Sequence, residues 1–195
     1  MDYRCLPNTA VSAAGCFIRD MFNPPTVTAD STAVSVMTDL TKVSPATIHQ
    51  EPNLEEANQS MILRGVRLLL VIDGHSRLVG VVTTVDLLGE KPLMVAQKRQ
   101  SRRSDLRVAD VMTPVENMEI LRIEDVLKGS VGDIVATLKS DGRSHALVVS
   151  TTETGVQHLA GIFSISQIAR QLGVQIQTHE MARTFAEVEA VIAGI

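Results

Sequence analysis

Residues 65–72, Gly-Val-Arg-Leu-Leu-Leu-Val-Ile, return in a similar form at residues 142–149 as Gly-Arg-Ser-His-Ala-Leu-Val-Val. The apolar stretch that follows, Leu-Val-Gly-Val-Val-Thr at residues 78–83, returns as Leu-Ala-Gly-Ile-Phe-Ser at residues 159–164. Matches in the same order indicate a duplicated unit, which decides the architecture before any single helix or strand is assigned. The chain is therefore expected to consist of two similar repeats.

A third match precedes these two in each copy, because Val-Met-Thr stands at residues 36–38 and again at residues 111–113. The largest difference in length between the copies falls at residues 151–155, where the second copy holds the polar stretch Thr-Thr-Glu-Thr-Gly. Insertions are tolerated best in exposed turns. We therefore expect a turn there, with a shorter turn at Asp73-Gly74 in the first copy.

A helix is expected near the middle of each copy. In the first copy Asn53 followed by Glu56 is a helix-start signature, and Ser130 with Asp133 is its counterpart in the second copy, where Gly142 ends the helix. The apolar residues expected on the buried face are Leu54, Ala57, Met61 and Ile62 in the first helix, and Val131, Ile134, Val135 and Leu138 in the second.

Strands are expected on both sides of this helix. A short strand at 46–48 or 118–123 precedes it, two strands follow it, at 68–72 and 78–82 in the first copy, and a short helix at 83–88 ends the unit. One copy of about 50 residues holds too little core to stand alone. The expected fold class is α/β, of the α+β-like kind, with two strand-helix-strand-strand-helix repeats packed as a pseudo-twofold pair.

The tail of the chain carries Met181, Phe185, Val188 and Ile192 on one face of an amphipathic helix. This face is expected to cover the protein's own surface, with a partner protein as the alternative. The expected division of the chain is an irregular N-terminal segment (1–30), a first repeat (31–90), a basic linker (91–107), a second repeat (108–175) and a C-terminal amphipathic helix (176–195).

Composition argues against nucleic-acid binding. The 195 residues carry a net charge of −4, and only 3% are aromatic, so neither a general attraction for phosphate backbones nor base-stacking platforms are expected. The one basic run, at residues 98–103, is interpreted as a solvated helix or linker. A DNA or RNA role through this run ranks last among the hypotheses.

The two cysteines, Cys5 and Cys16, belong to no Cys-x-x-Cys or Cys/His cluster, which predicts a reduced intracellular protein. The N-terminus has no signal-peptide pattern, and no segment approaches the ~18 consecutive apolar residues of a membrane span. We expect a cytoplasmic protein that is neither secreted nor inserted in a membrane.

Enzyme signatures are missing from the sequence. It contains no Gly-x-Ser-x-Gly turn, no phosphate-binding Gly-x-x-x-x-Gly-Lys loop and no dinucleotide-binding Gly-x-Gly-x-x-Gly turn. Its five histidines lack the spacings of a local zinc or iron site. The sequence therefore predicts a protein that is not an enzyme and that needs no metal or cofactor.

The repeated pattern of Val-Met-Thr, then Gly-Val-Arg with an apolar strand, then Leu-Val-Gly-Val-Val-Thr-Thr-Val-Asp resembles the cystathionine-β-synthase (CBS) domain, over residues 34–88 and 109–172. Tandem CBS domains form Bateman modules, whose cleft commonly binds adenine nucleotides or S-adenosylmethionine and which usually form dimeric discs. With no enzyme or channel domain attached, the resemblance implies a free-standing, homodimeric, regulatory sensor module.

By the family's pattern, Thr83 and Asp86 occupy the hydroxyl and ribose-binding positions of an adenosine site. The Asp86 carboxylate offers two acceptor oxygens to a ribose diol, beside helix N–H groups that suit a phosphate or ribose oxygen. Thr-x-x-Asp is also a plain helix-capping arrangement, so a purely structural role stays open. In the second copy Ser164 and Gln167 keep the cap but lose the carboxylate, so the first site is expected to be the stronger or the only one.

Three further residues are candidates for ligand contact. The family pattern places Arg67 over the cleft, where its guanidinium reaches a phosphate. His145 is a candidate phosphate contact in the second site, with a hydrogen-bonded core histidine as the alternative. Thr47 is expected to frame the base with backbone groups, on family grounds alone.

The leading hypothesis is thus a module that binds AMP, ADP, ATP or S-adenosylmethionine and signals by a change of angle between its repeats. One alternative is a structural interaction module that has lost ligand binding, which the departure at Gln167 favours. Another is a regulatory subunit of a partner enzyme or transporter, with the tail helix as its contact.

Overall fold

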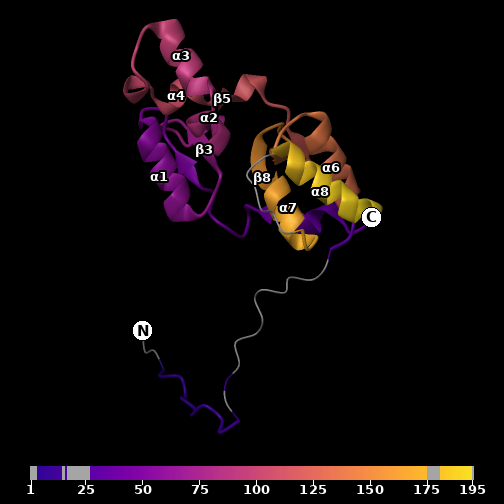
Figure 1. Ribbon diagram of the computed structural model, residues 1–195. Coiled ribbons are helices and arrows are strands. Elements are labelled where there is room, and N and C mark those ends of the chain that lie inside the picture. The colour runs from indigo at the N-terminus through magenta and orange to yellow at the C-terminus, as the bar shows by residue number, and fades with distance from the viewer. Residues whose placement is uncertain (1–3, 15, 17–26, 175–180, 195) are drawn as a thin grey trace.

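The computed structural model describes residues 4–14, 16, 27–174 and 181–194 (Figure 1). Residues 4–14 contain no helix or strand, and most of the rest of the segment 1–26 lies outside the described residues. The first half of the fold contains η1 (Ala33–Val36), β1 (Thr38–Asp39), β2 (Thr47–Ile48), α1 (Leu54–Arg64), β3 (Leu68–Ile72), β4 (Leu78–Thr83), α2 (Thr84–Leu88) and α3 (Lys91–Arg99). The second half contains η2 (Arg103–Asp105), α4 (Val108–Val111), β5 (Thr113–Pro114), η3 (Val115–Asn117), β6 (Leu121–Arg122), α5 (Ile123–Val126), α6 (Val131–Ser140), β7 (His145–Thr151), β8 (Gln157–Ser164), α7 (Ile165–Gln171) and α8 (Met181–Ala193).

Matching capping boxes start the long helix of each repeat, as the sequence predicts. Before α1 the Asn53 side chain accepts from the Glu56 N–H at 2.9 Å, and the Asn53 N–H donates to the Glu56 carboxylate at 2.8 Å. Ser130 and Asp133 make the same pair of bonds before α6. The expected face of α6 is buried throughout. In α1 the prediction for Ile62 is wrong, because its side chain is 70% exposed while Leu54, Ala57 and Met61 are buried.

Removing the first cap is expected to cost about 1 kcal/mol of stability, because Asn53→Ala leaves the Glu56 N–H without its side-chain acceptor. Asn53→Asp keeps that acceptor and should cost much less. Urea denaturation of the two variants measures the difference. Equal losses for Ala and Asp would show that the cap contributes nothing.

The sheets exchange strands between the repeats. The first sheet has the order β2-β3-β4-β5, and the second has the order β1-β8-β7-β6. Each repeat therefore supplies three strands of its own sheet and receives the fourth from the other repeat, so that Val81 pairs with Thr113 and Thr38 pairs with Ile162. This exchange was not predicted, and it joins the two repeats into one unit.

The predicted hairpin of each repeat is confirmed, with β3 antiparallel to β4 and β7 antiparallel to β8. The strand expected at 118–123 is shorter, because it covers only Leu121–Arg122 and residue 123 already begins α5.

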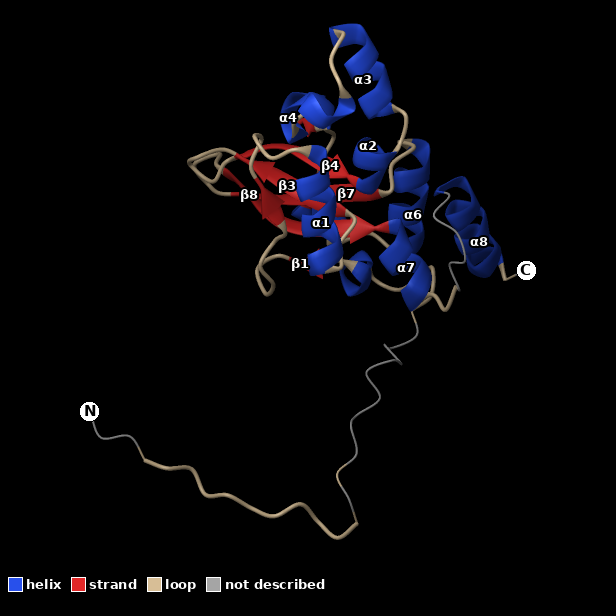
Figure 2. Ribbon diagram, turned by 60° about the vertical axis from the view of Figure 1, so that its left-hand side comes forward, coloured by secondary structure: helices blue, strands red, loops and turns tan. Residues whose placement is uncertain are grey.

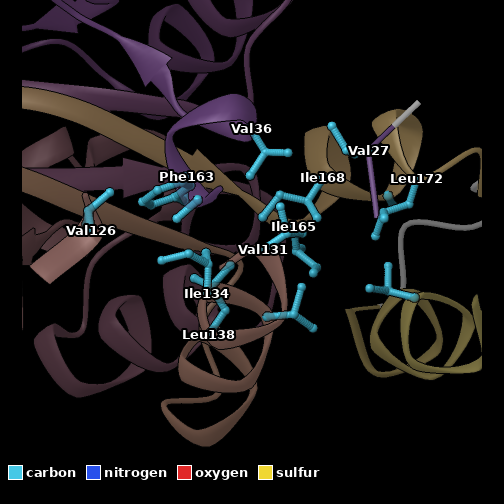
Figure 3. Packing of buried hydrophobic residues seen from close by; sticks show 14 of the residues in the cluster. Val27, Val36, Val126, Val131, Ile134, Leu138, Phe163, Ile165, Ile168 and Leu172 are labelled. Atoms are coloured by element: carbon cyan, nitrogen blue, oxygen red, sulfur yellow. The ribbon is translucent and has the colours of Figure 1, made fainter. Parts of the chain in front are cut away.

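The described residues form three hydrophobic clusters. One is centred on the second repeat and includes Val27, Ala33 and Val36, one is centred on the first repeat and includes Val108 and Val111, and one lies between the repeats. Figure 3 shows the cluster of the second repeat, where Val36, Phe163 and Ile165 gather from η1, β8 and α7. The cluster between the repeats brings Leu68, Leu70 and Val81 of the first sheet against Leu147 of the second. The two sheets lie between outer helices (Figure 2), which confirms the α/β fold of two packed repeats.

A helix follows each repeat, but the two helices pack differently. After the first repeat, α3 buries Pro92 and Ala96, and its Arg99 pairs with Asp110 of α4. The predicted basic linker therefore contains a helix packed on the first repeat.

After the second repeat, α8 buries Phe185 and Val188 in that repeat's cluster, beside α6 and α7 (Figure 1). The prediction that the tail covers the protein's own surface is confirmed, although the Met181 side chain lies outside the described residues. Within the described part of the chain, no helix has both the length and the apolar character that a membrane crossing requires.

Candidate functional site

Two cavities related by the duplication lie between the repeats, and each takes its walls from both. The Asp86 cavity, of about 260 Å³, is formed by Thr83 and Asp86 at the start of α2 together with residues 142–145 of the second repeat. The Ser164 cavity, of about 600 Å³, is formed by Ser164 and Gln167 at the start of α7 together with residues 64–68 of the first repeat. Drug-sized ligands occupy cavities of roughly 300–1,000 Å³, so the Ser164 cavity offers the room for a nucleotide.

In the Asp86 cavity the carboxylate is engaged by the protein itself. One Asp86 oxygen accepts from the Thr83 N–H at 2.9 Å and from the Thr83 hydroxyl at 2.7 Å, and the other lies 2.7 Å from Lys91 Nζ of α3. Across the cavity Arg143 and Glu119 form a second ion pair at 3.7 Å. A ribose diol at Asp86 would have to displace the cap or the Lys91 ion pair.

The corresponding residues of the Ser164 cavity are arranged differently, and the predicted cap at Ser164 and Gln167 is wrong. Ser164 makes no side-chain cap. Gln167 does not reach back to Ser164, because its Oε1 accepts from the Thr38 hydroxyl at 3.1 Å. Thr38 belongs to β1, the strand contributed by the first repeat. The hydrogen bond from Thr38 thus holds the Gln167 side chain in the wall of the cavity. The amide N–H₂ group of Gln167 is then able to donate to a ligand.

Arginine side chains give the Ser164 cavity a positive character. Arg64 and Arg67 line it from the first repeat and Arg170 lines it from α7, and no Asp or Glu is among the described residues of its lining. Burial, and then the nearby charge of Arg170, lower the pKa of Arg67. Two guanidinium groups that repel each other across a cavity are stabilised when an anion binds between them. This cavity therefore suits a phosphate group.

Sequence reasoning missed Arg64 and Arg170 as lining residues. Arg170 stands four residues after Ser166 on α7, to whose carbonyl its Nε donates at 3.2 Å. That i, i+4 spacing places it on the helix face that carries Ser166 and was available as a signal. Arg64 is the last residue of α1. At that position the sequence pattern does not distinguish an arginine that lines the cavity from one that is exposed to solvent.

The predicted site residues are divided between the two cavities. Arg67 lies in the Ser164 cavity with Gln167, and not in the Asp86 cavity with Thr83. His145 lines both cavities. Thr47 lies in β2 beside Leu70 and is absent from both linings, whereas its neighbour Ala46 lines the Ser164 cavity.

His145 is held neutral at the junction of the cavities. Burial, and then the charge of Arg67, lower its pKa from 6.5 to about 4, while its Nδ1 lies 2.9 Å from the Ser144 hydroxyl. Near neutral pH this ring is therefore an uncharged hydrogen-bonding group.

The lowered pKa of His145 predicts a loss of stability in mild acid. Between pH 6.5 and about 4, His145 binds a proton in the unfolded chain but stays neutral in the folded chain. The free energy of unfolding therefore falls as the pH drops through this window. His145→Gln removes this contribution. Urea denaturation at pH 7 and pH 5 should show a smaller loss for the variant than for the wild type, and equal losses would contradict the placement of His145.

Among the residues that the structure describes, no group of three or more His, Cys, Asp or Glu side chains is arranged to hold a metal ion.

Comparison with known proteins gives one family and a set of similar structures. The model of the CBS domain matches residues 18–92. A conserved protein of Pyrococcus horikoshii is 19% identical, with a TM-score of 0.54 over 77% of this chain and 98% of that one. A CBS-domain-containing protein of Agrobacterium tumefaciens is 17% identical, with a TM-score of 0.52 over 74% of this chain and 94% of that one.

One further structure carries a ligand. The structure of CBSX2, a CBS-pair protein of Arabidopsis thaliana, in complex with AMP is 25% identical, with a TM-score of 0.51 over 72% of this chain and 94% of that one. No curated protein matches the chain.

Proposed function

Because the chain belongs to the CBS-domain family and carries the domain as a tandem pair, we propose that it is a regulatory module, without catalytic activity of its own, that binds an adenosine ligand between its repeats. The AMP complex of the similar CBS-pair protein supports this ligand class. A homodimeric assembly, which the family resemblance implies, is part of the proposal. So is a cytoplasmic location, which the isolated cysteines and the lack of a signal-peptide pattern predict.

The ligand is a phosphorylated adenosine, namely AMP, ADP or ATP, and it binds first in the Ser164 cavity. The observation that carries this proposal is the lining with Arg64, Arg67 and Arg170 and with no described acidic residue. Phosphate oxygens match guanidinium groups in charge and geometry. S-adenosylmethionine carries a sulfonium cation, which the same arginines repel, so it is the disfavoured member of the class. Ser164 and the Gln167 amide supply neutral hydrogen bonds to the ribose.

The Asp86 cavity is then a second and weaker site. Binding there has to break the 2.7 Å ion pair between Asp86 and Lys91. This order reverses the expectation from sequence, which placed the stronger site at Thr83 and Asp86.

A thermal-shift series with adenosine, AMP, ADP, ATP and S-adenosylmethionine tests the proposal. A ligand at ~100 times its dissociation constant adds ~2.7 kcal/mol of stability, so the phosphorylated compounds should raise the melting temperature clearly and S-adenosylmethionine should not. Asp86→Ala should leave most of the shift intact. If none of the compounds raises the melting temperature at millimolar concentration, the module is not a nucleotide sensor.

The second candidate is an interaction module without a ligand. It is favoured by the contacts of Asp86 within the protein, because one carboxylate oxygen accepts hydrogen bonds from Thr83 and the other accepts one from Lys91. This candidate predicts that none of the five compounds binds, and it requires a protein partner.

A further inference from the structure

The helix that follows the first repeat reaches back to the Asp86 cavity. Lys91 is the first residue of α3, and its Nζ lies 2.7 Å from Asp86 Oδ1. The other oxygen, Oδ2, accepts from the N–H and the hydroxyl of Thr83. The Asp86 side chain is 15% exposed and that of Lys91 is 40% exposed, so the ion pair is partly buried. Lys91 therefore binds the one carboxylate oxygen that Thr83 leaves available.

Two arginines of the basic run at residues 98–103 hold this helix in place. Arg99, the last residue of α3, pairs with Asp110 of α4. Arg103 of η2 donates to the Leu87 carbonyl oxygen of α2 at 3.0 Å. Figures 1 and 2 both show α3 beside α2 and α4. The basic run thus anchors α3 with its first residue next to the start of α2.

Among the described residues, the second repeat has no counterpart of the ion pair. Residues 86 and 91 correspond in the duplication to Gln167 and Leu172. Gln167 is uncharged and lines the Ser164 cavity, and Leu172 is buried in the hydrophobic cluster of the second repeat. The two related cavities therefore differ in one charged contact, which the chain makes only in the first.

We propose that Lys91 is a built-in competitor that closes the Asp86 cavity to adenosine ligands and sets the difference in affinity between the two cavities. This inference concerns the regulation of the weaker site and rests on the proposed function. A ribose diol donates its hydroxyl hydrogens to a carboxylate, and here it has to replace the Lys91 ammonium on Asp86 Oδ1. Because Lys91 belongs to the same chain, its effective concentration at Asp86 is set by the fold and not by the amount of ligand.

The competition acts on the ribose end of the ligand, because the ammonium and the diol use the same carboxylate oxygen. Adenosine isolates this effect. It carries the diol and the base but no phosphate, so removing the charge of Lys91 takes away no attraction for a phosphate group. A gain in adenosine affinity on removing Lys91 therefore reports the opening of the cavity.

Isothermal titration calorimetry with adenosine compares the full-length wild type with Lys91→Met, which removes the ammonium and keeps a good helix former. The affinity should rise about 10-fold, the lower end of the range for a charge-assisted hydrogen bond, because Lys91 is partly exposed. Lys91→Arg keeps a cation and should stay near the wild type. The matched control is Lys98→Met, at an exposed lysine near the end of the same helix. Adding Asp86→Ala to Lys91→Met should abolish the gain.

An adenosine affinity that Lys91→Met leaves unchanged would overturn the proposal. A gain that survives Asp86→Ala, or an equal gain in Lys98→Met, would also overturn it, because the effect would then not come from the Asp86 carboxylate.

ADP binding to the wild type is measured separately and tests the proposed function. If ADP binds and Lys91→Met does not change the adenosine affinity, only the closure by Lys91 is wrong. If ADP does not bind while Lys91→Met gains adenosine affinity that depends on Asp86, the assignment of the phosphorylated ligand to the Ser164 cavity fails and the closure by Lys91 stands.

Discussion

Replacing Arg67 by serine is expected to weaken ADP binding about 10- to 100-fold, because charge-assisted hydrogen bonds are each worth about 1.5–3 kcal/mol. Serine is the residue that the second repeat has at the corresponding position, Ser144, so the substitution is compatible with the start of this strand. Arg67 is half-buried, and its charge lies near that of Arg170. A phosphate that binds between them therefore relieves the repulsion between Arg67 and Arg170. In the Arg67→Ser variant this repulsion is absent, so that contribution to binding is lost.

The control for this prediction lies in the other cavity. Arg143 is adjacent to Ser144 and is paired with Glu119 in the Asp86 cavity, so Arg143→Ser should leave the ADP affinity nearly unchanged. Adenosine, which has no phosphate, should lose little affinity in Arg67→Ser. Isothermal titration calorimetry measures both ligands. An equal loss for adenosine and ADP would mean that Arg67 shapes the cavity and does not bind phosphate.

Placing an alanine at Gly80 is expected to destabilise the protein by about 3 kcal/mol, the upper part of the range for overpacking. A Cβ at residue 80 would lie 2.6 Å from the Thr113 carbonyl oxygen and 3.2 Å from Pro114 Cα, which are backbone atoms of β5. Since β5 is the strand received from the second repeat, the strand pair that joins the repeats has to separate.

The duplicated glycine provides the matched control. A Cβ at Gly161 would contact only the side chain of Met37 among its nearest atoms, and a methionine can change its rotamer. Gly161→Ala should therefore cost about 1 kcal/mol. Urea denaturation of the two variants gives the comparison, and a larger loss at Gly161 than at Gly80 would contradict the strand exchange as described.

The elements of each repeat could be predicted because their signals are local. The capping pairs Asn53–Glu56 and Ser130–Asp133 lie within one helical turn, and the hairpin strands are continuous apolar runs. The strands Thr38–Asp39 and Thr113–Pro114 have two residues each, which is too short for any periodicity. Their partners lie in the other repeat, so the exchange is a tertiary property.

The candidate site was predicted less well for the same reason. Thr83 and Asp86 form the capping pair that their spacing allows, but Gln167 turns to Thr38, a residue 129 positions away. In the folded protein Arg67 lines a cavity with Gln167, whereas Asp86 is paired with Lys91. A signal for the exchange was present in Gly80 and Gly161, because glycine inside a strand often marks a close backbone approach.

A crystal structure of the full-length protein grown with ADP tests the central claim, that the Ser164 cavity holds the phosphorylated ligand. The account predicts the ribose beside Ser164 and Gln167 and the phosphates between Arg67 and Arg170, with the Asp86–Lys91 ion pair intact. A nucleotide seated at Thr83 and Asp86 with the Ser164 cavity empty would contradict it.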